Sequence, residues 1–214
     1  MKKRACIITG GVVSQELLFT VLQKGIYAVV IAVDGGLRAA HQLKISPDYI
    51  VGDFDTVSPD LLEEYETEKI VRHSPEKDQT DTELAIDIAV QSGCLEIDFF
   101  GATGSRLDHS LANVFLLQRL LETGVEGTIW NDNNRLYLKN KGFTIRKEEA
   151  YGDYVSLLPL SETVEQVTLT GFKYPVTNRA FKRACSLGIS NEIVAEEAIV
   201  EFAGGIFIVV ESRD

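Results

Sequence analysis

Short apolar runs alternate with amphipathic stretches along the first 130 residues of the chain. The expected strands are the apolar runs at residues 5–9, 27–33, 49–51, 70–71 and 95–100. Their near-continuous hydrophobicity is typical of parallel strands that are buried on both faces. Residues 14–22 and 80–89 place apolar side chains at helical spacing, and Thr80 with Glu83 has the spacing of a capping box. The alternation predicts a mostly parallel α/β domain with three layers.

The pattern changes after about residue 130, where no long helical period remains. The chain then contains short β-rich runs at residues 135–138, 143–146, 154–158, 166–170, 198–202 and 206–211. Turn-forming residues separate them, in particular the Asn-Asp-Asn-Asn segment 131–134 and the two glycines 204–205. We therefore expect two domains: an α/β domain over residues 1–130 and an all-β sandwich over residues 131–214.

Aspartates recur in four short segments of the first half. These are Asp34-Gly35-Gly36, Gly52-Asp53-Phe54-Asp55, Asp78-Gln79-Thr80-Asp81 and the stretch from Gly101 to His109. Each follows an apolar run, so each is expected at the carboxyl edge of the sheet, where open α/β sheets bind ligands. Carboxylates gathered there would repel one another and any phosphate, unless a hard divalent cation lies between them. Because Mg²⁺ prefers one or two carboxylates together with phosphate oxygens, the pattern predicts a metal and phosphate site for phosphoryl-type transfer.

The acidic motifs, taken singly, also have plainer interpretations. Asp53 and Asp55 would point to the same side of an extended segment, with Phe54 turned into the core, but many such pairs are solvated turns. Asp81 lies near the positive end of a predicted helix, where its charge is stabilised without a metal. Only the combination of segments favours a site over separate turns and caps.

The glycine-rich segment 101–108 is the candidate phosphate loop. Its glycines allow close approach of the backbone, the following helix offers free N–H groups, and Arg106 can make a bidentate phosphate contact. A tight strand-to-helix turn explains the glycines alone about equally well. We expect Asp108 to cap the helix, while His109 can be a general base, a phosphate contact or a packing residue.

Composition narrows the range of partners. The formal net charge of −11 over 214 residues argues against broad binding to nucleic acid or to anionic membranes. Three cysteines without CxxC spacing fit a reducing cytoplasm, and no apolar run approaches the length of a membrane span. We expect a cytoplasmic protein with small-molecule ligands.

The four acidic segments, in this order and followed by a β-rich part, resemble the thiamin pyrophosphokinase family over nearly the whole chain. The segment 186–192 (Ser-Leu-Gly-Ile-Ser-Asn-Glu) is similar to the family's Ser-Asn segment near the thiamin site. Thr56 stands where the family usually has serine, which is a conservative departure. The resemblance implies a homodimer that transfers the terminal pyrophosphate of ATP to the hydroxyl of thiamin, giving thiamin diphosphate and AMP.

The resemblance also implies roles for individual residues. It makes Asp53, Asp55 and Asp81 the Mg²⁺ ligands. Asp34 and Asp78 would line the same pocket, and either could accept the hydroxyl proton, so catalytic roles are expected for Asp34, Asp55, Asp78 and Asp81. The residues expected to hold ATP are Gly101, Thr103, Gly104, Arg106, Asp108 and His109. Those expected to contact thiamin are Ser190, Asn191 and Tyr174, the last stacking from the partner subunit.

Other functions remain open from the residues alone. A pyrophosphokinase acting on a pterin alcohol would use the same layout and the same ATP chemistry, although the β domain and the Ser190-Asn191 segment favour thiamin. A metal-dependent phosphohydrolase would also use clustered aspartates. A nucleotide-sensing protein without catalytic activity would not need Asp53, Asp55, Asp78 and Asp81 together, because binding alone favours neutral or basic contacts.

Overall fold

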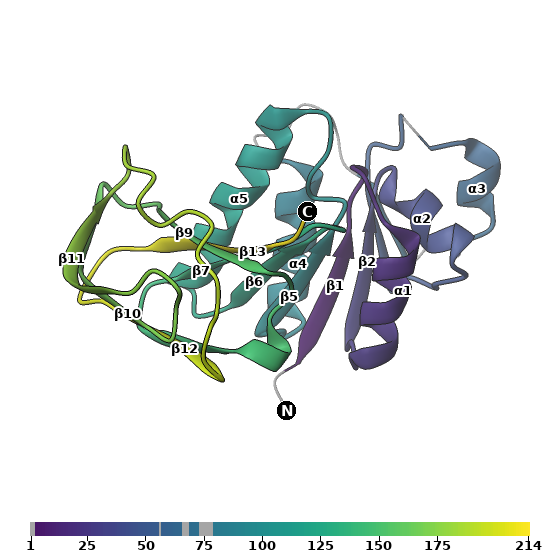
Figure 1. Ribbon diagram of the computed structural model, residues 1–214. Helices are drawn as coiled ribbons and strands as arrows, with labels where there is room; N and C mark the ends of the chain where they lie inside the picture. Colours follow the sequence, from purple (N-terminus) through teal and green to yellow (C-terminus); the bar gives the residue numbers. More distant parts are fainter. Residues whose placement is uncertain (1–2, 56, 66–68, 73–78) are drawn as a thin grey trace. The chain divides into compact units, whose positions relative to one another are not determined.

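The protein is described from a computed structural model covering the chain except residues 1–2, 56, 66–68 and 73–78 (Figure 1). The chain divides into two compact units, Met1–Asp132 and Asn133–Asp214, and each is described by itself. In the described part of the chain, no helix combines the length and the apolar character needed to cross a membrane.

The first unit is an alternating α/β structure. Its elements are β1 (Arg4–Ile8), α1 (Gln15–Lys24), β2 (Val29–Val33), α2 (Gly36–Gln42), β3 (Tyr49–Gly52), α3 (Pro59–Glu63), β4 (Ile70–Arg72), α4 (Asp81–Gln91), β5 (Glu96–Phe100), α5 (Leu107–Glu122) and β6 (Glu126–Trp130). These strands pair in parallel in the order β4-β3-β2-β1-β5-β6. The predicted parallel α/β domain is confirmed, and β6 is a strand beyond the five that the sequence indicated.

Helices cover both faces of this sheet. Alternate residues of β1, Cys6 and Ile8, are fully buried and belong to one cluster with Leu18 of α1 and Leu37 of α2. On the opposite face α5 packs so closely on β6 that a Cβ at Gly127 would lie 2.7 Å from the Leu117 side chain. Figure 1 shows α4 and α5 together behind the sheet, with α1 in front. The expected three-layer arrangement follows from this alternation of buried side chains.

The N-termini of α4 and α5 show which of the predicted helix caps form. The capping box is confirmed at α4, where the Thr80 backbone N–H donates to Glu83 at 2.9 Å and the Thr80 hydroxyl accepts from the Glu83 N–H at 3.3 Å. The expectation for α5 is wrong, because its N-cap is Arg106 and Asp108 is the second residue of the helix. The Asp108 carboxylate is engaged by the Arg106 guanidinium instead.

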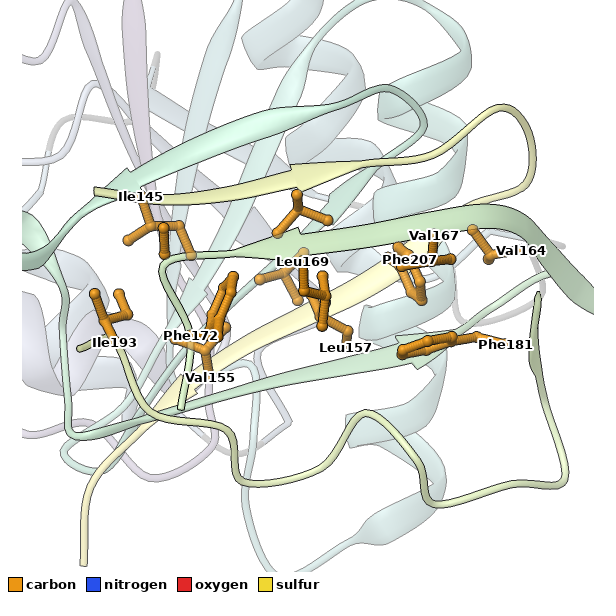
Figure 2. Packing of buried hydrophobic residues seen from close by; sticks show 13 residues of the cluster. Ile145, Val155, Leu157, Val164, Val167, Leu169, Phe172, Phe181, Ile193 and Phe207 are labelled. Atoms are coloured by element: carbon orange, nitrogen blue, oxygen red, sulfur yellow. The ribbon is translucent and has the colours of Figure 1, made fainter. Parts of the chain in front are cut away.

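The second unit is an antiparallel β-sandwich. Its elements are β7 (Asn134–Lys139), β8 (Phe143–Arg146), the 3-10 helix η2 (Lys147–Glu149), β9 (Tyr154–Pro159), β10 (Thr163–Thr170), β11 (Val176–Lys182), β12 (Glu197–Glu201) and β13 (Phe207–Ser212). β13 pairs with β7 and β9, and the other sheet has the order β11-β10-β12-β8. Apolar side chains from both sheets fill the space between them (Figure 2). Phe207 is fully buried there and makes edge-to-face contacts with Phe181 and Phe202 at centroid distances of 5.7 and 5.2 Å.

Candidate active site

The candidate site lies where the strand order reverses in the first unit. From β1 the chain proceeds to β2, β3 and β4 on one side, and it then returns to place β5 and β6 on the other. A pocket of about 820 Å³ opens beyond the carboxyl ends of these strands. Its lining comes from Thr9–Gly11 after β1, Asp34 and Gly35 after β2, Asp55 after β3, Gly101–Arg106 after β5, and the first turns of α2, α4 and α5. Such a switch point is the usual ligand site of an open α/β sheet.

Two glycine loops form the floor of the pocket at this point. The Gly11 N–H donates to the Gly101 carbonyl at 3.0 Å, and the Val12 N–H donates to the Thr103 carbonyl at 3.0 Å. A Cβ at Gly11 would lie 2.1 Å from the Gly101 oxygen, so only glycine allows this approach. Gly10 and Gly11 carry no recognised phosphate-loop motif, and the signal for their role is two glycines directly after the first strand.

Asp34 is the most strained acidic residue of the pocket. Its φ of 45° is in the left-handed region, and its Oδ1 is buried with no hydrogen-bond partner among the described residues. Burial, the charge of Asp81, a hydrogen bond shared with Asp81 and the charge of Asp53 together raise the pKa of Asp34 to about 7. Carboxyl groups so close together cannot all ionise freely, and a bound cation would relieve the conflict.

The sequence predicted an extended Asp53–Asp55 segment, and this prediction is wrong. Phe54 has a φ of 62°, and the Asp55 N–H donates to the Asp53 carboxylate at 3.1 Å, so the segment is a tight turn. Phe54 is nonetheless buried in the core, as expected, with 7% exposure. Asp55 lines the pocket, whereas Asp53 contributes its charge next to Asp34.

The donor set determines how a metal ion can be held. Across residues whose placement the structure gives, no group of three acidic, His or Cys side chains is arranged as a ready metal cluster. The charges of Asp81 and Asp53 beside Asp34, whose Oδ1 is buried without a partner among the described residues, fit a cation held by neighbouring carboxylates that completes its shell with phosphate and water. Asp78, predicted to line the same pocket, lies outside the described residues.

The predicted phosphate loop faces the same pocket. Arg106 forms a two-pronged pair with Asp108, with Nε–Oδ1 at 3.2 Å and Nη2–Oδ2 at 2.6 Å, and both side chains are exposed. This pair raises the pKa of Arg106 and lowers that of Asp108 to about 2. His109 is exposed and also lines the pocket. Arg38 of α2 is an exposed cation that also lines the pocket, and it was not predicted because an arginine inside a helix belongs to no motif.

Polar side chains of neighbouring elements hold the loop from Gly101 to Gly104 in place. Asn113 Nδ2 donates to the Ala102 carbonyl at 2.8 Å, and Asn131 Nδ2 donates to the Thr103 hydroxyl at 3.1 Å. The Gly104 N–H donates to the hydroxyl of Ser110 at 3.3 Å. Gly101, Thr103 and Gly104 are therefore held by neighbouring elements, and the loop is preorganised for a ligand.

The second unit brings its three predicted contact residues together. Tyr174 is 60% exposed, Ser190 is exposed, and Asn191 is buried. The backbone N–H of Tyr174 donates to Asn191 Oδ1 at 3.0 Å, which connects the two segments. Neither sequence position nor residue type indicated that Ser190 and Asn191 would lie in such different environments.

In a comparison with known protein families, each of the two units matches a family model. Residues 25–129 match the family described as "Thiamin pyrophosphokinase, catalytic domain", and residues 142–207 match "Thiamin pyrophosphokinase, vitamin B1 binding domain". The chain belongs to the thiamin pyrophosphokinase family. The thiamine pyrophosphokinase of Bacillus subtilis (strain 168) is 35% identical over 192 residues, which cover 86% of this chain and 87% of that protein.

Solved structures of family members share the fold. The crystal structure of thiamine pyrophosphokinase from Bacillus subtilis gives a TM-score of 0.89 at 31% identity, covering 99% of this chain and 100% of that one. The thiamin pyrophosphokinase of Geobacillus thermodenitrificans gives 0.83 at 32% identity, covering 99% and 98%. The chain is thus a transferase with thiamine diphosphokinase function, as the sequence motifs predicted, and the pterin and phosphohydrolase alternatives are not favoured.

Proposed function

We propose that the pocket of the first unit binds the triphosphate of ATP together with Mg²⁺, and that the second unit binds thiamin at Tyr174 and Ser190. The observation that carries the proposal is the Asp34–Asp81 pair, which shares a hydrogen bond and lines the same pocket as Arg106. In the reaction the thiamin hydroxyl attacks the β-phosphorus in line, and the α-phosphate leaves as part of AMP.

The loop after β5 and the start of α5 are assigned to the phosphates. Arg106 exchanges its partner Asp108 for phosphate oxygens. Breaking this ion pair costs little free energy, because both side chains are exposed to water. The main-chain N–H groups at the start of α5 add a favourable dipole for an anion. These contacts hold the triphosphate in one orientation, and positioning of this kind supplies much of the catalysis in phosphoryl transfer.

The carboxylates are assigned to the cation and to the proton. Asp55 and Asp81 line the pocket and Asp53 adds charge beside it, so these residues are proposed to hold Mg²⁺. When bound, Mg²⁺ neutralises phosphate charge and favours negative charge on the leaving oxygen. Asp34, half-buried at the same edge, is proposed to accept the proton of the attacking hydroxyl together with, or in place of, Asp78.

The proposal includes a homodimer. In addition to the family resemblance, it is supported by Leu107, Leu111 and Phe115, which are exposed at successive turns of α5. Exposed apolar rows of this kind are common where subunits associate. Sedimentation velocity of the whole chain tests the assembly directly, because a monomer at micromolar concentration would contradict it.

The decisive test of function is AMP release from ATP by the purified protein. AMP is expected only when both thiamin and Mg²⁺ are present, in equal amount with thiamin diphosphate. Release of inorganic phosphate without thiamin would instead identify a phosphohydrolase. ATP binding without any turnover would identify a nucleotide-binding protein.

A further inference from the structure

Ser190 and Asn191 are neighbours in the chain with opposite environments. Ser190 is exposed and has a φ of 55°, which is a left-handed conformation that a serine seldom adopts. Asn191 is only 7% exposed. The left-handed backbone at Ser190 therefore connects an exposed residue to a buried one. The Ser190 side chain is accessible to a ligand, whereas the Asn191 side chain is enclosed by the protein.

The side chain of Asn191 is used inside the protein. Its Oδ1 accepts hydrogen bonds from the backbone N–H groups of Tyr174 and Glu192, each at 3.0 Å, and its Nδ2 donates to the Tyr174 carbonyl at 2.9 Å. One amide thus satisfies both backbone polar groups of Tyr174, as a neighbouring β-strand would.

The backbone of Asn191 is fixed as well. It exchanges two hydrogen bonds with Val155 at the start of β9, at 2.8 and 3.0 Å. The segment before Tyr174 runs beside the segment after Asn191, since the Lys173 N–H donates to the Glu192 carbonyl at 2.9 Å. Asn191 therefore connects the backbone of Tyr174 to a strand of the sandwich.

The ring of Tyr174, in contrast, is exposed at the surface of the second unit. The side chain is 60% exposed although both backbone polar groups of the residue are bound. The Lys173 ammonium lies 5.7 Å from the ring centroid and pairs with Glu192 at 2.6 Å, so the ring already attracts a cation in the absence of ligand. Thiamin is also a cation.

We infer that Asn191 is a positioning residue for thiamin: it fixes the backbone from which the Tyr174 ring projects and does not itself touch the substrate. The inference rests on the proposed role of Tyr174, and it changes the role that the family resemblance implied for Asn191. A ring on a fixed backbone loses less conformational freedom when it stacks on a ligand. The Asn191 side-chain amide therefore raises the affinity for thiamin indirectly, by holding the backbone of Tyr174.

A double-mutant cycle tests this coupling. Asn191→Leu keeps the volume and removes all three side-chain hydrogen bonds. We expect it to raise KM for thiamin about tenfold while kcat and KM for ATP change less than about twofold. In a Tyr174→Ala background, the same change should alter KM for thiamin less than about twofold, because Asn191 then has no ring to position.

The controls separate positioning from general damage. Ser161→Ala removes one comparable hydrogen bond, the 3.0 Å contact from the Ile206 N–H, at the other end of β9, and it should leave KM for thiamin unchanged. Asn191→Asp retains the acceptor oxygens and loses the amide donor, so an intermediate KM is expected. An undiminished effect of Asn191→Leu in the Tyr174→Ala background would overturn the inference, as would an unchanged KM in the single variant.

A ligand-free measurement keeps the inference independent of the enzyme assay. Amide hydrogen exchange at Tyr174 should be at least about tenfold faster in Asn191→Leu than in the wild type, with exchange in β10 and β13 unchanged. Asn191→Asp keeps the oxygen that accepts from the Tyr174 N–H, so exchange at Tyr174 should stay slow in that variant. Equal exchange at Tyr174 in the wild type and in Asn191→Leu would overturn the positioning role. If Asn191→Leu failed to fold, Asn191→Ala removes the same acceptor oxygen and takes its place in the measurement. Absence of thiamin-dependent AMP from the wild type would reject the proposed function and leave the exchange result to decide this point.

Discussion

The Cα of Gly52 lies directly against the carboxyl group of Asp34, so closely that a Cβ at Gly52 would be 1.9 Å from Oδ1. Glycine at the end of β3 therefore determines where the strained acid of the neighbouring strand can lie. The contact joins two sequence motifs that are 18 residues apart and gives a direct way to displace Asp34 without changing its chemistry.

Gly52→Ala is expected to push the Asp34 carboxyl out of place. We expect a loss of about 1–3 kcal/mol in unfolding free energy, typical of overpacking, and at least about a tenfold fall in kcat. Urea unfolding followed by the fluorescence of Trp130, the single tryptophan of the chain, reports on the first unit. Gly204→Ala is the control, because a Cβ there meets nothing within 4 Å. Wild-type kcat in Gly52→Ala would contradict the contact.

Asp34→Asn is expected to stabilise the metal-free protein at neutral and alkaline pH. The pKa of Asp34 is raised to about 7 by burial and by the charges of Asp81 and Asp53. Below the unfolded-state pKa, near 4, Asp34 is protonated in both the folded and the unfolded protein, so it does not lower the free energy of unfolding. Between there and about pH 7 the unfolded chain releases the proton more readily, and wild-type stability falls as pH rises.

The measurement is urea unfolding in EDTA at pH 4 and pH 8. Since Asp34 is partly solvated, we expect Asn at this position to gain about 1–2 kcal/mol over the wild type at pH 8 and little at pH 4. Saturating Mg²⁺ should narrow the difference at pH 8. A gain of the same size at both pH values would show that charge is not its cause.

Asp81→Asn is expected to remove Mg²⁺-dependent activity while the fold remains. The capping box of Thr80 and Glu83 still begins α4, so unfolding free energy should change by less than about 1 kcal/mol. We expect kcat to fall at least about 100-fold and half-saturation to require more Mg²⁺. Asp60→Asn, which neutralises an exposed acid of α3, should keep full activity. Activity near the wild-type level in Asp81→Asn would reject its assignment to the metal.

Arg106→Ala is expected to weaken ATP binding selectively. Charge-assisted contacts to phosphate contribute about 1.5–3 kcal/mol, so KM for ATP should rise roughly 10- to 100-fold with little change in KM for thiamin. Stability should be nearly unchanged, because the pair with Asp108 is exposed. Arg146→Ala removes an exposed arginine of the second unit and serves as the charge control. Unchanged ATP affinity in Arg106→Ala would exclude a phosphate contact.

The sequence predicted the parts of the fold that depend on local periodicity. Buried parallel strands read as apolar runs, and the Thr80–Glu83 spacing correctly located the start of α4. β6 was overlooked because Glu126–Trp130 is short and mixes polar with apolar residues. Asp108 was misplaced because a side chain that can cap a helix was paired instead with an arginine two residues before it.

The site was predictable as a set of segments but not in its conformation. The left-handed backbone of Asp34 and Phe54 depends on contacts with other strands, which residue types do not encode locally. The role of Gly11 depends in the same way on its distance to Gly101, 90 residues further along the chain. Asn191 is the clearest case, since only its burial and its hydrogen bonds distinguish it from exposed Ser190.

The route of the chain through the first sheet explains how Asp81 reaches Asp34. After β4, at one edge, the chain must pass three strands to become β5 on the far side of β1, and α4 makes that crossing in contact with β3, β2 and β1. Asp81, in the first turn of α4, lies near Asp34 because α4 crosses the sheet, and its neighbours in the sequence do not by themselves produce this placement. The contacts of α4 with β3, β2 and β1 thus hold this carboxylate, and a different strand order would separate the pair even if every aspartate were retained.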